Sequence, residues 1–154
     1  MCGRAGYTAS RSLRVSTMPS VTKAHLMSRD EGISFCRRLV ESTPALSPIL
    51  AEHLSDNFGE ILPHHFVADV SRWHLARIRQ GDLVDAGELA TYVDREYVSG
   101  SPYVQDLLAA SFIESLPWEH EEESLAIRST LGPALQARQR EMWSWRPSRG
   151  TREA

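Results

Sequence analysis

The sequence predicts an all-α fold, a compact bundle of about six to seven helices. No stretch alternates apolar and polar residues over more than four positions, as a half-buried strand would. Apolar residues instead recur every three or four positions through most of the chain, as on the buried face of a helix. Proline and glycine interrupt these periodic stretches at intervals of ordinary helix length. We therefore expect one helical domain over residues 28–145.

Three helices are expected in the first half of this domain, over residues 28–42, 47–54 and 62–79. The first begins where Ser28 and Glu31 match a capping box, and a proline two residues beyond its end stops it. The second begins with a serine–proline pair, which suits the start of a helix. The third carries an apolar stripe with spacings of four, four and three, made of Leu62, Phe66, Val70 and Trp73.

Four further helices are expected over residues 85–98, 101–116, 124–131 and 133–145. The turn between the first two of these has only about two to four residues, so the two helices must return on each other as an antiparallel hairpin. The acidic residues Glu121–Glu123 precede the next helix, where a helix N-terminus favours negative charge. A glycine–proline pair separates the last two helices.

Charge divides the chain into a basic beginning, an acidic body and a basic end. Residues 1–27 hold four basic residues and no acid, and residues 138–154 hold five basic residues against two acids. The body between them holds 18 acidic and eight basic residues. An acidic body repels a phosphate backbone, so we do not expect nucleic acid as the main partner. No apolar run approaches the roughly 20 residues of a membrane span, so we expect no membrane association.

The two ends, residues 1–27 and 146–154, are expected to be disordered tails. The Ser- and Arg-rich start superficially resembles an organellar transit peptide, but a start codon assigned too early would explain it as well. Two cysteines, Cys2 and Cys36, provide neither a disulfide framework nor a set of zinc ligands. We therefore expect a cytoplasmic protein in which Cys36 is a reduced, buried thiol.

The sequence contains no motif of nucleophilic catalysis and no glycine-rich phosphate loop, and no cofactor is expected. His65 and Asp69 lie four residues apart and would share one helix face. This spacing permits a metal-dependent enzyme or metal sensor, with Glu60 or a distant carboxylate completing the site. The alternative is that Asp69 pairs locally with His65 or Arg72 at the edge of the apolar stripe.

Two edges of the bundle are candidate partner-binding surfaces. An acidic surface on a rigid helical scaffold suits the capture of a protein with a basic surface, because complementary charge speeds association. An exposed tryptophan beside acidic residues would add an anchor, although such a residue can instead cover the end of the core. The first edge consists of Trp118, Glu119, Glu121 and Glu122. The second edge consists of Glu60, His64, His65 and Asp69.

About half of the chain, residues 58–135, resembles an uncharacterised family of small bacterial helical proteins. The likeness rests on Phe58-Gly59-Glu60-Ile61-Leu62-Pro63-His64, on Asp69 and Arg72-Trp73, and on the blocks Val104–Leu108 and Phe112–Leu116. These last blocks are also similar to the helical hairpins of HEAT-like repeats and of helical immunity proteins from bacterial toxin systems. The resemblance implies an all-α, protein-binding molecule, such as an immunity or regulatory protein, and implies no catalytic residues.

Overall fold

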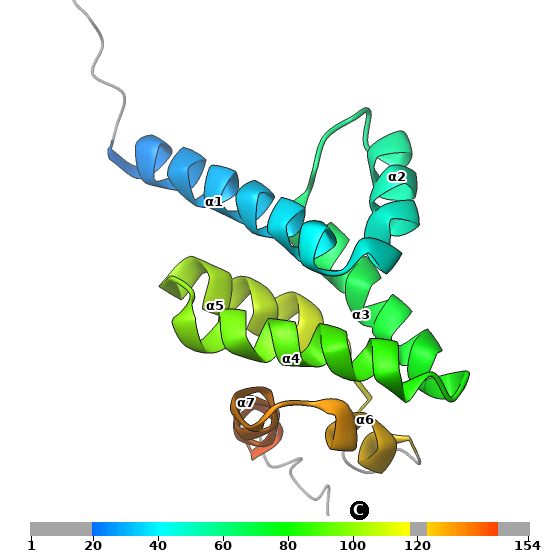
Figure 1. The fold of residues 1–154 in the computed structure, drawn as a ribbon. Coiled ribbons are helices and arrows are strands. Elements are labelled where there is room, and N and C mark those ends of the chain that lie inside the picture. Colours follow the sequence, from blue (N-terminus) through cyan, green and yellow to red (C-terminus); the bar gives the residue numbers. More distant parts are fainter. Residues whose placement is uncertain (1–19, 118–122, 145–154) are drawn as a thin grey trace, which may run out of the picture.

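The computed structural model describes residues 20–117 and 123–144, in which seven α-helices and no strand are found (Figure 1). The predicted all-α fold is therefore confirmed. In chain order the elements are α1 (Ser20–Ser42), the 3-10 turn Pro44–Leu46, α2 (Ser47–Asp56), α3 (Pro63–Arg79), α4 (Leu83–Ser99), α5 (Pro102–Leu108), the π-helical turn Ala109–Ile113, α6 (Ser124–Thr130) and α7 (Pro133–Ser144).

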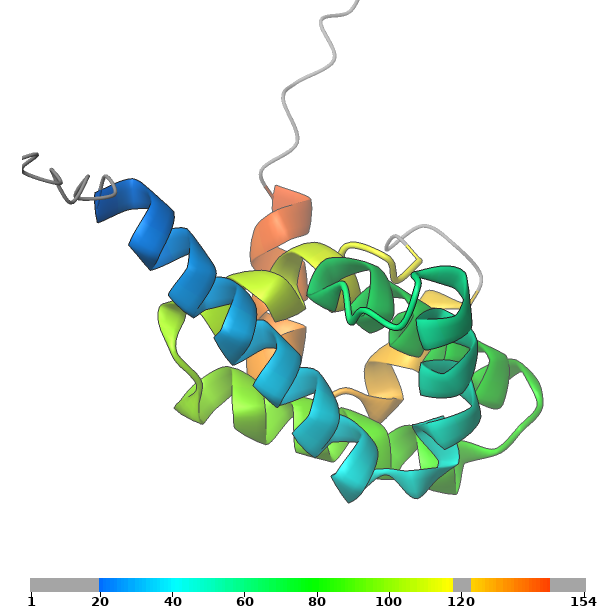
Figure 2. The same ribbon diagram turned by 90° about the horizontal axis from the view of Figure 1, so that it is seen from above.

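Helix α3 lies at the centre of the fold, where it contacts α1, α2, α4, α5 and α6. Helices α4 and α5 return on each other as the predicted antiparallel hairpin, with α1 crossing on one side of the pair and α6 and α7 on the other (Figure 1). The view from above shows α1 lying across this hairpin and its first turns extending past the other helices (Figure 2). None of the helices described combines the length and the apolarity needed to cross a membrane.

The core is formed where the apolar faces of these helices meet. Phe35 of α1, Phe66 of α3 and Phe112 of the π-helical turn are fully buried in it. Trp73 is almost fully buried, as the apolar stripe of α3 predicts. Burying one such large side chain contributes roughly 1.5–3 kcal/mol to folding, so this shared core is the main source of stability. Cys36 is also fully buried and has a free thiol, as expected from its place in the sequence.

Helix α1 begins at Ser20, eight residues before the capping box expected at Ser28. Residues 20–27, assigned above to an N-terminal tail, are therefore helical. They contain no proline or glycine and include several residues of high helix propensity, so nothing in the local sequence ends the helix at Ser28. The capping box is a local signal, and the continuation of the helix overrides it.

The stretch 101–116, predicted as one helix, changes geometry after Leu108. Helix α5 ends there and continues as the π-helical turn, in which the amide of Glu114 donates to the carbonyl of Ala109 over 3.1 Å. A π-helical turn inserts one extra residue and shifts the side chains that follow it. The buried hydroxyl of Ser71 in α3 donates to the carbonyl of Phe112 over 3.0 Å and so ties this turn to the central helix.

Two positions show how neighbouring helices fit together. A Cβ atom at Gly32 of α1 would lie 2.8 Å from the ring of Pro63 and 2.9 Å from that of Tyr103, so only glycine permits this close approach. At the other side of the bundle, a carboxylate of α4 caps the start of α7. The amide of Leu135 donates to Asp94 over 2.9 Å, although the two residues are 41 positions apart.

Candidate functional site

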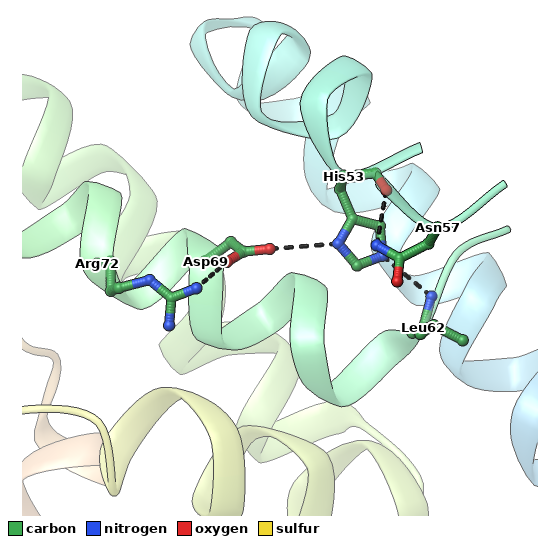
Figure 3. Close-up of polar contacts among 5 residues, drawn as sticks. All are labelled: His53, Asn57, Leu62, Asp69 and Arg72. Carbon is green, nitrogen blue, oxygen red and sulfur yellow. Dashed lines mark hydrogen bonds and ion pairs between the residues drawn. The ribbon is translucent and has the colours of Figure 1, made fainter. Parts of the chain in front are cut away.

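The corner between α2 and α3 is organised by a buried histidine, His53, that the sequence analysis did not single out (Figure 3). Its Nδ1 atom lies 3.2 Å from a carboxylate oxygen of Asp69, one helix away. Its Nε2 atom accepts a hydrogen bond of 3.1 Å from the backbone amide of Leu62. Its ring also meets that of Phe66 edge-on, with centroids 5.4 Å apart. His53 therefore holds α2, the following loop and α3 together.

These contacts determine the tautomer of His53 and occupy both of its ring nitrogens. Because Nε2 accepts a hydrogen bond from an amide, the ring proton is on Nδ1 and is donated to Asp69. Asp69 is in turn paired with the guanidinium of Arg72, one turn further along α3. No ring nitrogen is left to bind a metal or to accept a substrate proton. The contact between Asp69 and Arg72 confirms one of the two local pairings that the sequence left open.

The loop of residues 57–62 that leaves α2 is fixed by hydrogen bonds at both ends. The side chain of Asn57 donates to the carbonyl of His53 over 2.7 Å, and the amide of Gly59 donates to the carbonyl of Leu54 over 2.7 Å. The latter bond closes the last turn of α2 in the manner of a Schellman motif. Beyond it, the bond between Leu62 and His53 anchors the far end of the loop.

At the tip of this loop, Phe58 is fully exposed to solvent. Its φ angle is +55°, and it is the only residue other than glycine with a positive φ in the part of the chain that the structure describes. In a Schellman motif this position is normally a glycine, because a side chain strains the left-handed conformation. The protein therefore holds a large apolar side chain in water, in a strained conformation, on a loop that is otherwise well anchored.

Acidic side chains surround the base of the loop. Glu52 and Asp56 of α2 are both exposed, and neither has a cation partner among the described residues. Together with the ion pair of Asp69 and Arg72, they line a hollow of about 530 Å³ between α2 and α3, one wall of which is Trp73. The surface beside Phe58 thus combines an exposed aromatic ring with two acidic side chains, Glu52 and Asp56, that have no cation partner among the described residues.

The other predicted residues of the second edge do not gather around Asp69. Glu60 pairs with Arg29 of α1 over 2.7 Å. His64 turns toward α5 and the π-helical turn, where its Nδ1 atom hydrogen-bonds with Ser111 over 2.7 Å. His65 is exposed and lines a different hollow from Asp69. In the described parts of the chain no three side chains of His, Cys, Asp or Glu are grouped as metal ligands.

The first predicted edge cannot be placed in the same way. Trp118, Glu119, Glu121 and Glu122 lie outside the described residues. Glu123, which follows them directly, makes a bidentate ion pair with Arg79 of α3, with contacts of 2.8–3.1 Å. This hydrogen-bonded pair holds the pKa of the Glu123 carboxyl below its ordinary value.

Two further buried groups, Cys36 and His74, have shifted pKa values but are not arranged for catalysis. Burial raises the pKa of the Cys36 thiol to about 12, so the thiol is protonated and unreactive at neutral pH. Burial also lowers the pKa of His74 to about 4, an effect that the backbone of Ala86 opposes in part. Nε2 of His74 lies 3.2 Å from the hydroxyl of Thr130 in α6. His74 is thus a neutral ring that joins α3 to α6.

Comparison with known proteins assigns the chain to a family. Residues 36–144 match the family model described as a domain of unknown function, DUF7674. The chain belongs to this family. The match covers the end of α1 from residue 36 onward and all of the described helices after it, including the loop that carries Phe58. No curated protein and no solved structure matches the chain.

His53, which organises this corner, and Phe58, its functional candidate, are the residues that the sequence analysis missed. His53 is 16 residues from Asp69, and nothing in the sequence fixes the angle between the two helices that brings them together. In the sequence, Phe58 lies in a segment that ends the helical pattern, Asn57-Phe58-Gly59, and begins the block Phe58–His64 of the family resemblance, neither of which indicates an exposed ring. An aromatic residue at the usual glycine position of a helix end is the signal that would have identified it.

Proposed function

We propose that this chain is a non-enzymatic protein-binding module that docks a partner with a basic surface through the corner between α2 and α3. The observation that carries this proposal is Phe58, a fully exposed aromatic side chain held in a left-handed conformation. Strained residues persist where the surrounding structure holds them, and they concentrate at functional sites. Exposed aromatic side chains that become buried on binding are frequent hot spots of protein interfaces.

The charge beside Phe58 supports a basic partner. Glu52 and Asp56 project from the same short helix with no cation partner among the residues that the structure describes. A partner that brings lysine or arginine side chains to this surface gains complementary charge without breaking an existing ion pair. Such charges mainly speed association, while the buried aromatic ring slows dissociation.

We further propose, from the resemblance to HEAT-like helical immunity proteins, that the module acts in the bacterial cytoplasm as an immunity or regulatory protein of a toxin system. In that role the partner is a toxin or its carrier, and binding blocks a basic surface of the partner. The edge of Trp118, Glu119, Glu121 and Glu122 stays a prediction as a second contact surface. The alternative of a metal site at His65 and Asp69 receives no support from the described residues, because these two side chains line different hollows.

The proposal is tested by calorimetric titration of the protein with proteins encoded by neighbouring genes. F58G is expected to weaken binding at least about tenfold, since truncation of a hot-spot residue has effects of this size or larger. L125S is the matched control, because Leu125 is an exposed apolar residue on α6, away from this corner. Replacing both acids with E52Q and D56N is expected to lower the association rate and its dependence on salt. Equal binding by F58G and the unaltered protein to a partner that binds tightly would refute the proposal.

A further inference from the structure

We propose that Phe58 of one molecule inserts into an apolar hollow between α1 and α2 of a second copy of this chain, and that the exchange is reciprocal, giving a two-fold dimer. The inference rests on the proposed function in one respect: it uses the same loop as the docking element. It goes further in naming one partner of that loop, a second copy of the chain itself.

The hollow has the lining and the size that a phenyl ring requires. Its floor consists of four apolar side chains, of which Ile61 is buried and the other three are partly buried: Ile33 of α1, Leu50 and Leu54 of α2, and Ile61 of the loop. Its volume is about 380 Å³. An apolar cavity of about 150 Å³ is already large enough to bind benzene. The hollow therefore accepts one aromatic side chain with room for its neighbours.

The loop and the hollow adjoin each other, as a reciprocal contact requires. Gly59 and Glu60, the two residues after Phe58, line the hollow. Phe58 itself is fully exposed, so it does not fill the hollow of its own molecule. When the same patch carries both an anchor and a matching pocket, a two-fold axis beside the patch satisfies both contacts at once. Such a contact closes on itself and gives a dimer rather than a filament.

The hollow and the loop of Phe58 are flanked by opposite charges. Arg37 of α1 lies at the rim of the hollow, and Asp56, the last residue of α2 before the loop, lines the neighbouring hollow between α2 and α3. Both are exposed, and neither has an ion-pair partner among the described residues. Insertion of Phe58 into the hollow of a second copy brings Asp56 of the first copy to the rim that carries Arg37 of the second. The nearby pair of Arg29 and Glu60 is already formed within each molecule.

The size of the contact predicts a weak, concentration-dependent dimer. Two exchanged phenylalanine side chains together bury about 300–500 Å². Specific stable interfaces bury about 1,200–2,000 Å², so the exposed flanks of α1 and α2 must supply the rest. We therefore expect monomer and dimer to interconvert at accessible protein concentrations.

Analytical ultracentrifugation of the full chain over about a hundredfold range of concentration tests the inference. The unaltered protein and the control L125S are expected to sediment as a monomer–dimer equilibrium with equal dissociation constants. F58G is expected to raise the dissociation constant at least about tenfold. A protein that sediments as a monomer throughout, or an F58G variant that dimerises as well as the unaltered chain, overturns the inference.

A charge exchange tests the pairing itself. In a dimer of R37D, two carboxylates face each other at each contact between residues 37 and 56, and in a dimer of D56R two guanidinium groups do. Each variant alone is therefore expected to dimerise more weakly than the unaltered protein. An equimolar mixture of the two variants places opposite charges at both contacts and is expected to form a heterodimer more tightly than either variant forms a homodimer. A mixture that associates no better than its components contradicts the geometry proposed.

These outcomes separate the inference from the proposed function. A monomeric protein whose binding to another protein is lost in F58G would overturn the dimer and leave the proposed function standing. A dimer that is insensitive to F58G, combined with partner binding that is also insensitive, would overturn both. Loss of self-association in F58G with unchanged partner binding would support the dimer and overturn the proposed docking surface.

Discussion

Phe58 occupies a backbone position at which most proteins place glycine, so its left-handed conformation is strained. No packing contact of the side chain offsets this strain, because the ring is fully exposed to solvent. The left-handed conformation is held instead by the hydrogen bonds of the two neighbouring residues, Asn57 before Phe58 and Gly59 after it. Phe58 therefore lowers the stability of the fold in exchange for presenting an exposed aromatic ring.

Replacing Phe58 with glycine is expected to stabilise the isolated protein by up to about 1 kcal/mol, because relief of left-handed strain exceeds the added flexibility of the unfolded chain. The matched control is G59A, at the next residue, where φ is +82° and glycine is already present. That change is expected to destabilise by about 1 kcal/mol, since alanine is strained there. Urea denaturation measures both changes. A clear loss of stability in F58G would show that the ring packs on the protein.

His53 is expected to be a structural residue whose loss opens the loop. H53A removes the acceptor of the Leu62 amide and the contacts with Asp69 and Phe66. We expect it to lower the free energy of unfolding by about 2–4 kcal/mol. H53Q retains an oxygen that can accept a hydrogen bond from the Leu62 amide, so it is expected to lower the free energy of unfolding by less than H53A does. Denaturation gives the two energies, and hydrogen exchange at the amide of Leu62 reports the opening. Unchanged exchange in H53A would contradict the role described here.

At the scale of the elements, the contacts between helices depend on where glycine permits close approach. Gly32 of α1 and Gly87 of α4 are both inside helices, where alanine has the higher intrinsic propensity. Their surroundings differ. A Cβ atom at Gly32 meets two rings at under 3 Å, whereas one at Gly87 meets nothing within 4 Å.

We therefore expect G87A to stabilise the protein by about 0.5–1 kcal/mol, the propensity difference alone. G32A is expected to destabilise by about 1–2 kcal/mol, because the overpacking against Pro63 and Tyr103 exceeds the same gain in propensity. Thermal or urea denaturation of the pair checks the difference in sign. Equal stabilisation by both changes would show that α1 moves away from α3 at little cost.

The sequence predicts most of these elements because their boundaries are set locally. Proline at the start of α2, α3, α5 and α7 and the caps at Asp82 and Ser101 act on their own helix ends, so the bounds agree within a few residues. The early start of α1 and the π-helical turn were missed, because no stop signal or insertion marks them in the sequence. The contact between His53 and Asp69 depends on the angle between two helices, which no local pattern determines.

At the scale of the whole molecule, a neutral histidine joins the central helix to α6. His74 is fully buried, with its pKa lowered from 6.5 to about 4 by burial. Below the pKa of the unfolded chain, the unfolded state binds a proton that the folded state does not bind. The contribution of the neutral His74 to the free energy of unfolding is therefore fully present above pH 6.5, and it decreases as the pH falls from 6.5 towards 4.

The full decrease attributable to His74 is about 3 kcal/mol, reached near pH 4. Urea denaturation at a series of pH values is expected to show this slope in the unaltered protein and to lose it in H74L. H65Q, which changes an exposed histidine, is the control and is expected to keep the slope. An identical slope in H74L and the unaltered chain would assign the acid sensitivity to other groups.

The cap that Asp94 provides for α7 also implies an order of assembly. The amide of Leu135 in the first turn of α7 is satisfied by a side chain from α4, so a peptide of residues 133–144 alone lacks this bond. Short isolated helices are marginal in water even when they are well capped. Helix α7 is thus expected to gain its structure only on docking, after the α4–α5 hairpin has formed the surface that receives it.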